Sequence, residues 1–401
     1  MCSMRTPPFF RLQWQRQSQV DTHSAHSFLI SLLRGLAALQ VAAAHLRSEM
    51  FPGLRELADP PLYYQLLAFA TAFSHQAVVV FFLISGWLVG GSLLNKLDQP
   101  GAMTAYAIDR ATRLWTVLLP ALCLMLAVGA ITGAVTPSQA DFSAANDYSA
   151  ASFAGNLLGL QTVLVPTFAD NYALWSLSNE TWYYVQFPLL LIVFTGKTRM
   201  RQLFAATLLM LTAVGLPASM TVYFALWLLG ALFSRIRIDC TTAARVLMLV
   251  LAAGALFYLR ATEVNDDLKP DFFLKHLMYS LPLVAFLASM QRPLAASAGW
   301  MRMLAPAAHL LSEFSFTLYV IHVPMIKLLR HLGLQEFGRN RLVADQPVDF
   351  AIYFGMLLAI MAAAYLSYLL FESHTFRIRR MLKTALRSQT RRPAMVSASV
   401  K

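Results

Sequence analysis

The sequence alternates long apolar stretches with short polar connections over most of its 401 residues. Charged residues make up only 13% of the chain and hydrophobic residues 58%, against roughly 25% and 45–50% in soluble domains. A segment inside a bilayer must satisfy its own backbone hydrogen bonds, which a helix of about 20 apolar residues does. The pattern predicts an all-α, polytopic integral membrane protein with about ten transmembrane helices, at 28–46, 66–93, 114–134, 173–195, 203–218, 220–234, 244–260, 274–290, 307–329 and 350–371.

The distribution of Lys and Arg predicts how these helices cross the membrane. The connection 135–172 contains no Lys or Arg, whereas those around 197–201, 235–237 and 377–383 are basic. Because basic loops stay in the cytoplasm, 135–172 is expected outside and both termini in the cytoplasm. The segment 327–341 is then assigned to the outside although it contains Lys327, Arg330, Arg339 and Arg341. This segment is either a true exception to the charge rule or a sign that one span was missed.

The same pattern divides the chain into three parts. We expect a cytoplasmic N-terminal arm at 1–27, a transmembrane domain at 28–372 and a basic cytoplasmic tail at 373–401. The net charge of +12 fits basic loops beside anionic lipid of the inner or plasma membrane, and no pattern indicates a nucleic-acid partner. The three cysteines, at 2, 123 and 240, show no metal-binding spacing, so no metal is expected.

Two polar residues, Arg34 and His45, interrupt the first apolar stretch, eleven positions apart. Eleven residues rise about 16 Å along a helix and turn about 1100°, which is three turns plus about 20°. The two side chains therefore share one face at two depths. Ionisable groups inside a membrane are costly and usually functional. We expect them to border a polar cavity. Alternatively, the Arg34 side chain extends to the membrane–water interface, and His45 simply lies at that interface.

Further polar residues occur inside or beside other apolar stretches. In FFLISGWLVGG, Ser85 and its neighbouring glycine allow close helix packing. Arg110 and Arg113 share one helix face, which suits a polyanion such as a diphosphate, although anchoring by the positive-inside rule is the alternative. Glu180 lies within a span, where a carboxylate must be paired or protonated. The remaining candidates are Asn171, Trp175, Tyr319 and His322.

Taken in order, these stretches resemble the motifs of the membrane-bound acyltransferase family 3, which includes bacterial O-antigen and exopolysaccharide O-acetyltransferases. RGLAALQVAAAH resembles its arginine, ten residues, histidine signature, and FFLISGWL its Ser-Gly motif. Arg110 and Arg113 match its arginine pair. WSLSNETWYY and SFTLYVIHVP resemble two later motifs. The resemblance covers residues 28–375; it departs from the family at HQAVVV and at Trp87, where Phe or Tyr is usual.

The resemblance implies transfer of an acyl group, by default acetyl, from acyl-CoA to a hydroxyl of a carbohydrate or glycoconjugate. Acetyl-CoA is the implied co-substrate. His45 would be the general base and Glu180 would orient it, both in the outer halves of their spans, although an acyl-histidine intermediate stays open. The donor would be bound by Arg34, Ser85, Arg110 and Arg113. The acceptor would be bound by Asn171, Trp175, Tyr319 and His322.

Two other function classes fit parts of the pattern. Intramembrane His, Glu and Arg residues also occur in proton-coupled transporters of a glycan or small anion. Such carriers often contain an inverted repeat, and none is visible in this sequence. A sensor or assembly subunit without chemistry is the third alternative.

Overall fold

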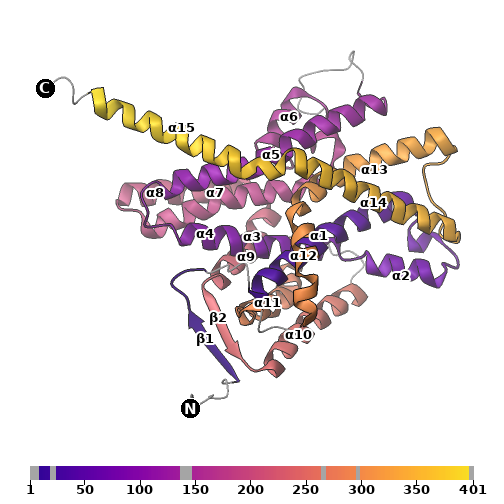
Figure 1. The fold of residues 1–401 in the computed structure, drawn as a ribbon, viewed down its shortest axis with the longest axis horizontal. Coiled ribbons are helices and arrows are strands. Elements are labelled where there is room, and N and C mark those ends of the chain that lie inside the picture. Colours follow the sequence, from indigo (N-terminus) through magenta and orange to yellow (C-terminus); the bar gives the residue numbers. More distant parts are fainter. Residues whose placement is uncertain (1–8, 19–23, 136–146, 263–267, 295–298, 397–401) are drawn as a thin grey trace.

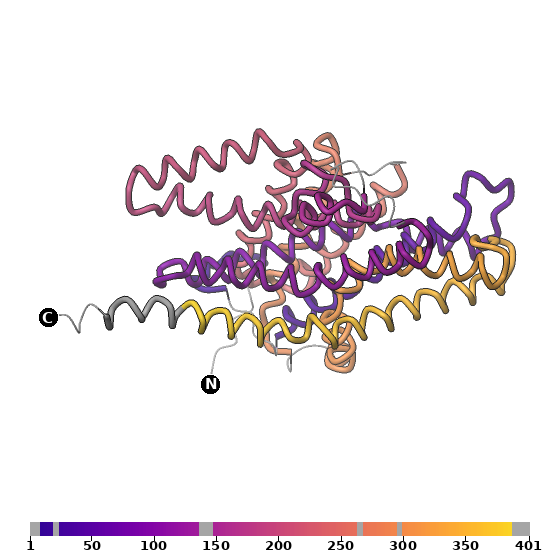
Figure 2. The backbone as a smooth tube through the Cα atoms, turned by 90° about the horizontal axis from the view of Figure 1, so that it is seen from above, coloured from indigo at the N-terminus to yellow at the C-terminus, as the bar shows by residue number. Residues whose placement is uncertain are grey.

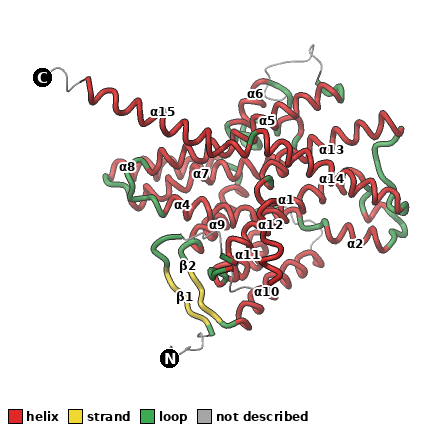
Figure 3. Tube along the Cα trace, in the orientation of Figure 1, coloured by secondary structure: helices red, strands yellow, loops and turns green. Residues whose placement is uncertain are grey.

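The computed structural model describes residues 9–18, 24–135, 147–262, 268–294 and 299–396, and most of them are helical (Figures 1 and 3). Cys2, considered above, lies outside the described residues, as does the segment 136–146 of the connection expected outside. The larger helices are α1 (Ala25–Met50), α2 (Leu62–Ala70), α3 (Ser74–Ser85), α5 (Ala102–Ile131), α6 (Ala150–Leu157), α7 (Trp175–Thr195), α8 (Arg199–Gly215), α9 (Ala218–Phe233), α10 (Thr242–Thr262), α11 (Phe273–Ser289), α12 (Gly299–Glu313), α13 (Ser315–Phe337), α14 (Pro347–Leu370) and α15 (Thr375–Val396).

Every stretch that the sequence predicts as a span overlaps a helix, but fewer of these helices are able to cross a bilayer alone. Among the described residues, six helical segments are long and apolar enough, and a seventh results if α12 and α13, bent by 56°, form one span. Of the three other predicted spans, α8 and α9 have only 17 and 16 residues, and α7 has 21 residues but is not among the segments that are long and apolar enough. The structure therefore supports an all-α integral membrane protein, whereas the expected count of about ten spans is not confirmed.

Helix α1 lies at the centre of the bundle and contacts α3, α12 and α13. Its small residues allow this close packing. A Cβ atom added at Gly35 would lie 2.7 Å from the side chain of Leu311 in α12, and Ala38 and Ala42 are fully buried. The close approach of α12 and α13 to α1 brings Ser315 within reach of Arg34, and His322 within reach of His45.

The Ser-Gly motif forms a π-helical turn, Gly86–Gly90, which joins α3 to the short helix α4 (Gly91–Leu94). A Cβ atom at Gly86 would lie 1.9 Å from the carbonyl oxygen of Trp227 in α9, and one at Gly230 would lie 2.0 Å from that of Leu83. The two backbones thus touch directly. Ser85 directly precedes this turn, and π-helical turns frequently mark functional sites.

Both ends of the chain pack on the bundle. In the N-terminal arm, β1 (Phe10–Trp14) pairs with β2 (Ile236–Cys240) in an antiparallel ladder with Leu12 opposite Ile238. At the other end, α14 turns at Glu372–His374 into α15, which runs beside α5 (Figure 2). The carboxylate of Asp109 in α5 forms ion pairs with two residues of α15, Arg379 at 3.2 Å and Lys383 at 2.5 Å. Helix α15 is thus attached to the bundle by charge.

The basic segment that breaks the charge rule is largely neutralised. Lys327 forms an ion pair with Asp170 at 3.2 Å, and Arg330 pairs with Glu49 of α1. The guanidinium of Arg339 binds the fully buried carboxylate of Asp349 at 2.7 Å. Three of the four Lys and Arg side chains of this segment therefore form ion pairs.

Candidate active site

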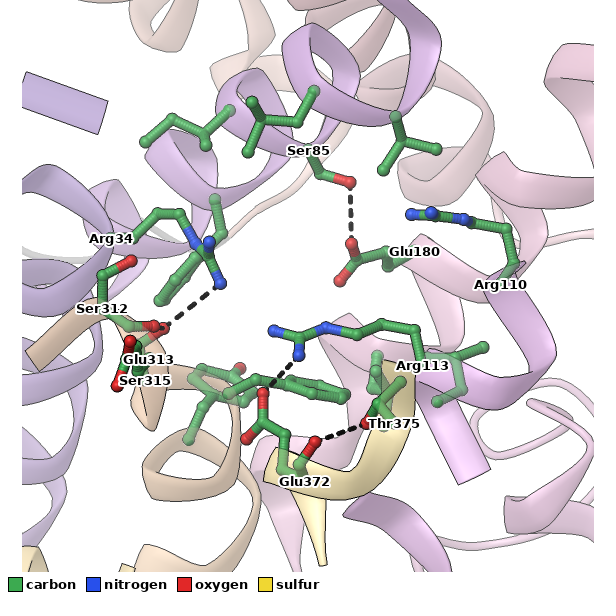
Figure 4. A pocket seen from close by; sticks show the side chains of 18 of the residues that line it. Arg34, Ser85, Arg110, Arg113, Glu180, Ser312, Glu313, Ser315, Glu372 and Thr375 are labelled. Carbon is green, nitrogen blue, oxygen red and sulfur yellow. Dashed lines mark hydrogen bonds and ion pairs between the residues drawn. The ribbon is translucent and has the colours of Figure 1, made fainter. Parts of the chain in front are cut away.

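A cavity of about 530 Å³ lies between α1, α3, α5, α7, α13 and the start of α15 (Figure 4). Its lining combines apolar side chains with an unusual number of charged groups. Four arginines and three glutamates line it: Arg34, Arg110, Arg113, Arg379, Glu180, Glu313 and Glu372. A pocket with apolar walls and a few convergent polar groups is typical of a small-molecule site.

The three arginines predicted to bind the donor all line this cavity. Arg34 donates to Ser315 Oγ at 3.5 Å, and in Figure 4 its guanidinium points across the cavity toward that of Arg113. Arg113 is paired with Glu372. The guanidinium carbon of Arg110 lies 5.6 Å from the ring centre of Tyr184, and none of the described ion pairs involves it. Arg110 and Arg34 are therefore available to an anionic ligand.

Glu180 lies in the same cavity and is held by hydrogen bonds. Ser85 Oγ donates to Glu180 Oε1 at 2.7 Å, and the Tyr184 hydroxyl donates to the same oxygen. Indole Nε1 of Trp227 donates to Ser85 Oγ at 3.1 Å, which fixes the serine in turn. The sequence suggested that Glu180 orients His45, on the opposite side from the arginines. The structure instead places Glu180 with the arginines and with Ser85.

The partner of His45 is His322. Nδ1 of His45 lies 2.8 Å from Nε2 of His322, and the two rings stack with centroids 5.0 Å apart. Nδ1 of the fully buried His322 lies 3.3 Å from the carbonyl oxygen of Leu318, one turn earlier in α13. The ring of Tyr172 meets His45 edge-on at 4.9 Å. The half-buried His45 is thus part of a chain of polar groups outside the cavity lining.

Tyr319 lies between the cavity and the histidines. It lines the cavity, and its ring centre is 5.9 Å from that of His322. Its hydroxyl lies 2.6 Å from Ser176 Oγ at the start of α7. The polar groups therefore continue from the cavity through Tyr319 and His322 to His45.

Two further predicted residues lie beside this site and not in the cavity lining. Asn171 is buried, and its Nδ2 donates to the carbonyl oxygen of Val320 at 3.0 Å, which ties the loop before α7 to α13. Trp175 is partly buried and packs against the hydrophobic core. The geometry gives Asn171 a part in positioning the loop.

Sequence reasoning did not single out Glu372 or Tyr172, and it placed Tyr184 only among the aromatic residues of an interfacial belt or a sugar platform. Glu372 is 3% exposed, pairs with Arg113 and accepts a hydrogen bond from Thr317 Oγ1 at 2.5 Å. One signal for it exists, because it is an acidic residue directly after an apolar span, in LLFES. The two tyrosines stand in aromatic-rich segments, where sequence alone does not distinguish a site residue from an interfacial one.

Comparison with known proteins agrees with this geometry. The sequence model of the acyltransferase 3 family, described as an acyltransferase domain, matches residues 29–369. No curated protein and no solved structure matches the chain. The matched region contains Arg34, His45, Glu180 and His322, and the helices around them form the cavity. The chain therefore belongs to the acyltransferase 3 family and is a membrane acyltransferase.

Proposed function

We propose that the protein is an O-acyltransferase that moves an acyl group, by default acetyl, from acyl-CoA to a hydroxyl of a carbohydrate or glycoconjugate. One observation carries this proposal. A cavity lined by four arginines adjoins, through Tyr319, a hydrogen-bonded pair of histidines. Cations suit the phosphates of a nucleotide donor, and a histidine suits removal of a proton from a hydroxyl.

The cavity is the proposed site of the donor. Arg110 and Arg113 would bind phosphate oxygens, for which planar guanidinium groups offer paired donors. Arg34 and His45 are eleven residues apart on one helix, a rise of about 16 Å. A single reacting carbonyl therefore cannot contact both. Arg34 would bind a more distant part of the donor, and the pantetheine arm would extend past Tyr319 toward His45.

The hydrogen bonds around His322 support His45 as the base. A carbonyl oxygen only accepts, so Nδ1 of His322 carries the proton directed at Leu318. Nε2 of a neutral His322 is then an acceptor, and Nδ1 of His45 donates to it. This assignment leaves the lone pair of Nε2 of His45 to receive a proton. His322 is thus a positioning residue, comparable to the group that orients the base in a catalytic triad.

The reaction then follows as a direct transfer. Nε2 of His45 takes the proton of the acceptor hydroxyl while the hydroxyl oxygen attacks the thioester carbonyl carbon. The carbon–sulfur bond breaks, and the leaving thiolate takes the proton back from His45. While His45 is cationic, its Nδ1–H donates a hydrogen bond to Nε2 of His322, and this hydrogen bond stabilises the charge.

The membrane arrangement belongs to the same proposal. Both termini would lie in the cytoplasm, where acyl-CoA is made, and the membrane would be the inner or plasma membrane. The arginine cavity would open toward the cytoplasm and His45 would face the outer side. The absence of Lys and Arg from 135–172, and the basic connections around 197–201, 235–237 and 377–383, support this orientation.

Mass spectrometry of surface glycans tests the acceptor class. Glycans from a strain that lacks the protein are compared with those from a strain that regains it from a plasmid. The proposal predicts that one glycan loses the mass of one acyl group and regains it on complementation. Identical glycan masses in both strains, with the protein present in the membrane of the complemented one, would contradict a glycan acceptor.

A further inference from the structure

The turn before α7 adopts a sterically disfavoured backbone. Ala169 and Asp170 both have left-handed conformations, with φ of 54° and 48°. Side chains with a Cβ atom rarely adopt this region, because Cβ approaches the following carbonyl oxygen. Such conformations persist only where surrounding groups hold them, and they concentrate at functional sites. The groups that hold this turn therefore indicate what it does.

Lys327 of α13 binds this turn with its ammonium group. Nζ donates to the carbonyl oxygen of Ala169 at 2.8 Å and to that of Asp170 at 3.1 Å. It also lies 3.2 Å from the carboxylate of Asp170. An ammonium group has three donors, and all three described contacts of Lys327 are to these two residues. Lys327 therefore fixes both left-handed residues at once.

The turn leads directly to the residue that covers the proposed base. Tyr172 follows two positions after Asp170, and its ring meets that of His45 edge-on at 4.9 Å. Asn171, between them, is tied to Val320 of α13. The segment is thus anchored to α13 on both sides of Asp170, and these two anchors determine where the Tyr172 ring lies.

Charged groups complete the surroundings of Tyr172. Glu49 lies one turn beyond His45 in α1 and pairs with Arg330, which is one turn beyond Lys327 in α13. Burial, together with the carboxylates of Glu49 and Asp170, raises the pKa of Tyr172. Its hydroxyl is protonated at neutral pH and donates a hydrogen bond to the carboxylate of Glu49. An aromatic face with one polar end suits a ligand that is both apolar and hydroxylated.

We propose that Tyr172 is the platform on which the carbohydrate acceptor packs beside His45, and that Lys327 is the positioning residue that holds this platform in place through the left-handed turn. The inference rests on the proposed O-acyltransferase function and deepens it. The acceptor hydroxyl would be directed to Nε2 of His45 by contact with the Tyr172 ring.

The test compares steady-state kinetics of acyl transfer in membrane vesicles for Lys327→Met, Tyr172→Leu and a matched control, Arg341→Met. Arg341 belongs to the same basic segment, and no contact that the structure describes involves it. Acceptor kcat/KM is expected to fall by about 10²-fold in both site variants, because displacement of a reacting group by roughly 1 Å costs that much. The donor KM is expected to stay unchanged, as is every parameter of Arg341→Met.

Glycine at the strained positions provides a second readout. Glycine adopts the left-handed conformation without strain, so Ala169→Gly with Asp170→Gly should restore part of the acceptor kcat/KM lost in Lys327→Met. An acceptor kcat/KM equal to that of the wild type in either Lys327→Met or Tyr172→Leu would overturn the inference. A rise in the donor KM by the same factor as the fall in acceptor kcat/KM would overturn it as well. Because wild-type transfer and its dependence on His45 are measured in the same vesicles, failure of the proposed function would be distinguished from failure of this inference.

Discussion

Nδ1 of His45 lies 2.8 Å from Nε2 of His322, so the intramembrane histidine of α1 finds its partner in α13 and not in the carboxylate of α7. This pairing separates two sets of groups. The arginines, Ser85 and Glu180 surround the cavity, and the histidines lie beyond Tyr319. Variants of the two sets should therefore change different kinetic parameters.

Loss of the His322 acceptor should slow the chemical step. In His322→Leu the Nδ1 proton of His45 has no acceptor, so the ring is free to leave its orientation. We expect kcat to fall by about 10²-fold, while the donor KM is unchanged. His322→Gln should keep more activity, because its amide oxygen can accept this proton. Initial rates in vesicles measure both, and a rate for His322→Leu equal to that of the wild type would exclude the positioning role.

Loss of the Arg110 charge should weaken donor binding. Hydrogen bonds to charged groups contribute about 1.5–3 kcal/mol, so Arg110→Gln should raise the KM for acetyl-CoA by about ten- to a hundredfold. Arg341→Gln removes the same charge elsewhere and serves as the control. Titration of acetyl-CoA at a fixed acceptor concentration measures the effect. Unchanged donor kinetics would leave Arg110 as a topology anchor only.

Glu372 should stabilise the junction between α14 and α15. Its buried carboxylate pairs with Arg113 and accepts from Thr317, so Glu372→Gln weakens both contacts. Because 28% of the Arg113 side chain is exposed, solvent screens part of the loss. We expect about 1–3 kcal/mol of destabilisation, seen as a lower Tm in detergent. In a double-mutant cycle, Arg113→Gln and Glu372→Gln together should cost less than the sum of the two single changes; strict additivity would argue against coupling.

The contact between the π-helical turn and α9 should not tolerate a methyl group. A Cβ atom at Gly86 would lie 1.9 Å from the backbone oxygen of Trp227, and neither backbone can move without displacing its helix. Overpacking in such a place typically costs about 1–3 kcal/mol and occasionally more. Gly254→Ala is the matched control, since no atom lies within 4 Å of its added Cβ. Thermal unfolding should separate the two variants, and an equal Tm would show that this close packing is unimportant.

Helical periodicity placed Arg34 and His45 on one regular helix, whose geometry is local, but it did not predict that only Arg34 lines the cavity. His45 belongs to the chain of polar groups next to the cavity. The partner of His45 was not predictable in the same way. It depends on how α13 packs on α1. The contact of Ser85 with Glu180 depends in the same way on the π-helical turn next to Ser85.

Other misses have the same origin in long-range contacts. The β1–β2 pair joins segments more than 200 residues apart, and short alternating strands carry little local signal. The sequence also does not reveal that Lys327 pairs with Asp170 and that Arg330 pairs with Glu49. Hydropathy also counted α8 and α9 as spans, although both are shorter than 18 residues.

The most direct test of the account is transfer of radiolabelled acetyl from acetyl-CoA to extracted glycan in vesicles that contain wild-type protein or His45→Ala. Equal amounts of folded protein in the two membranes are the control. The account predicts label in the glycan with wild-type protein and a loss of about 10²–10⁴-fold in rate with His45→Ala, as expected for a general base. Near-normal transfer by His45→Ala would contradict it.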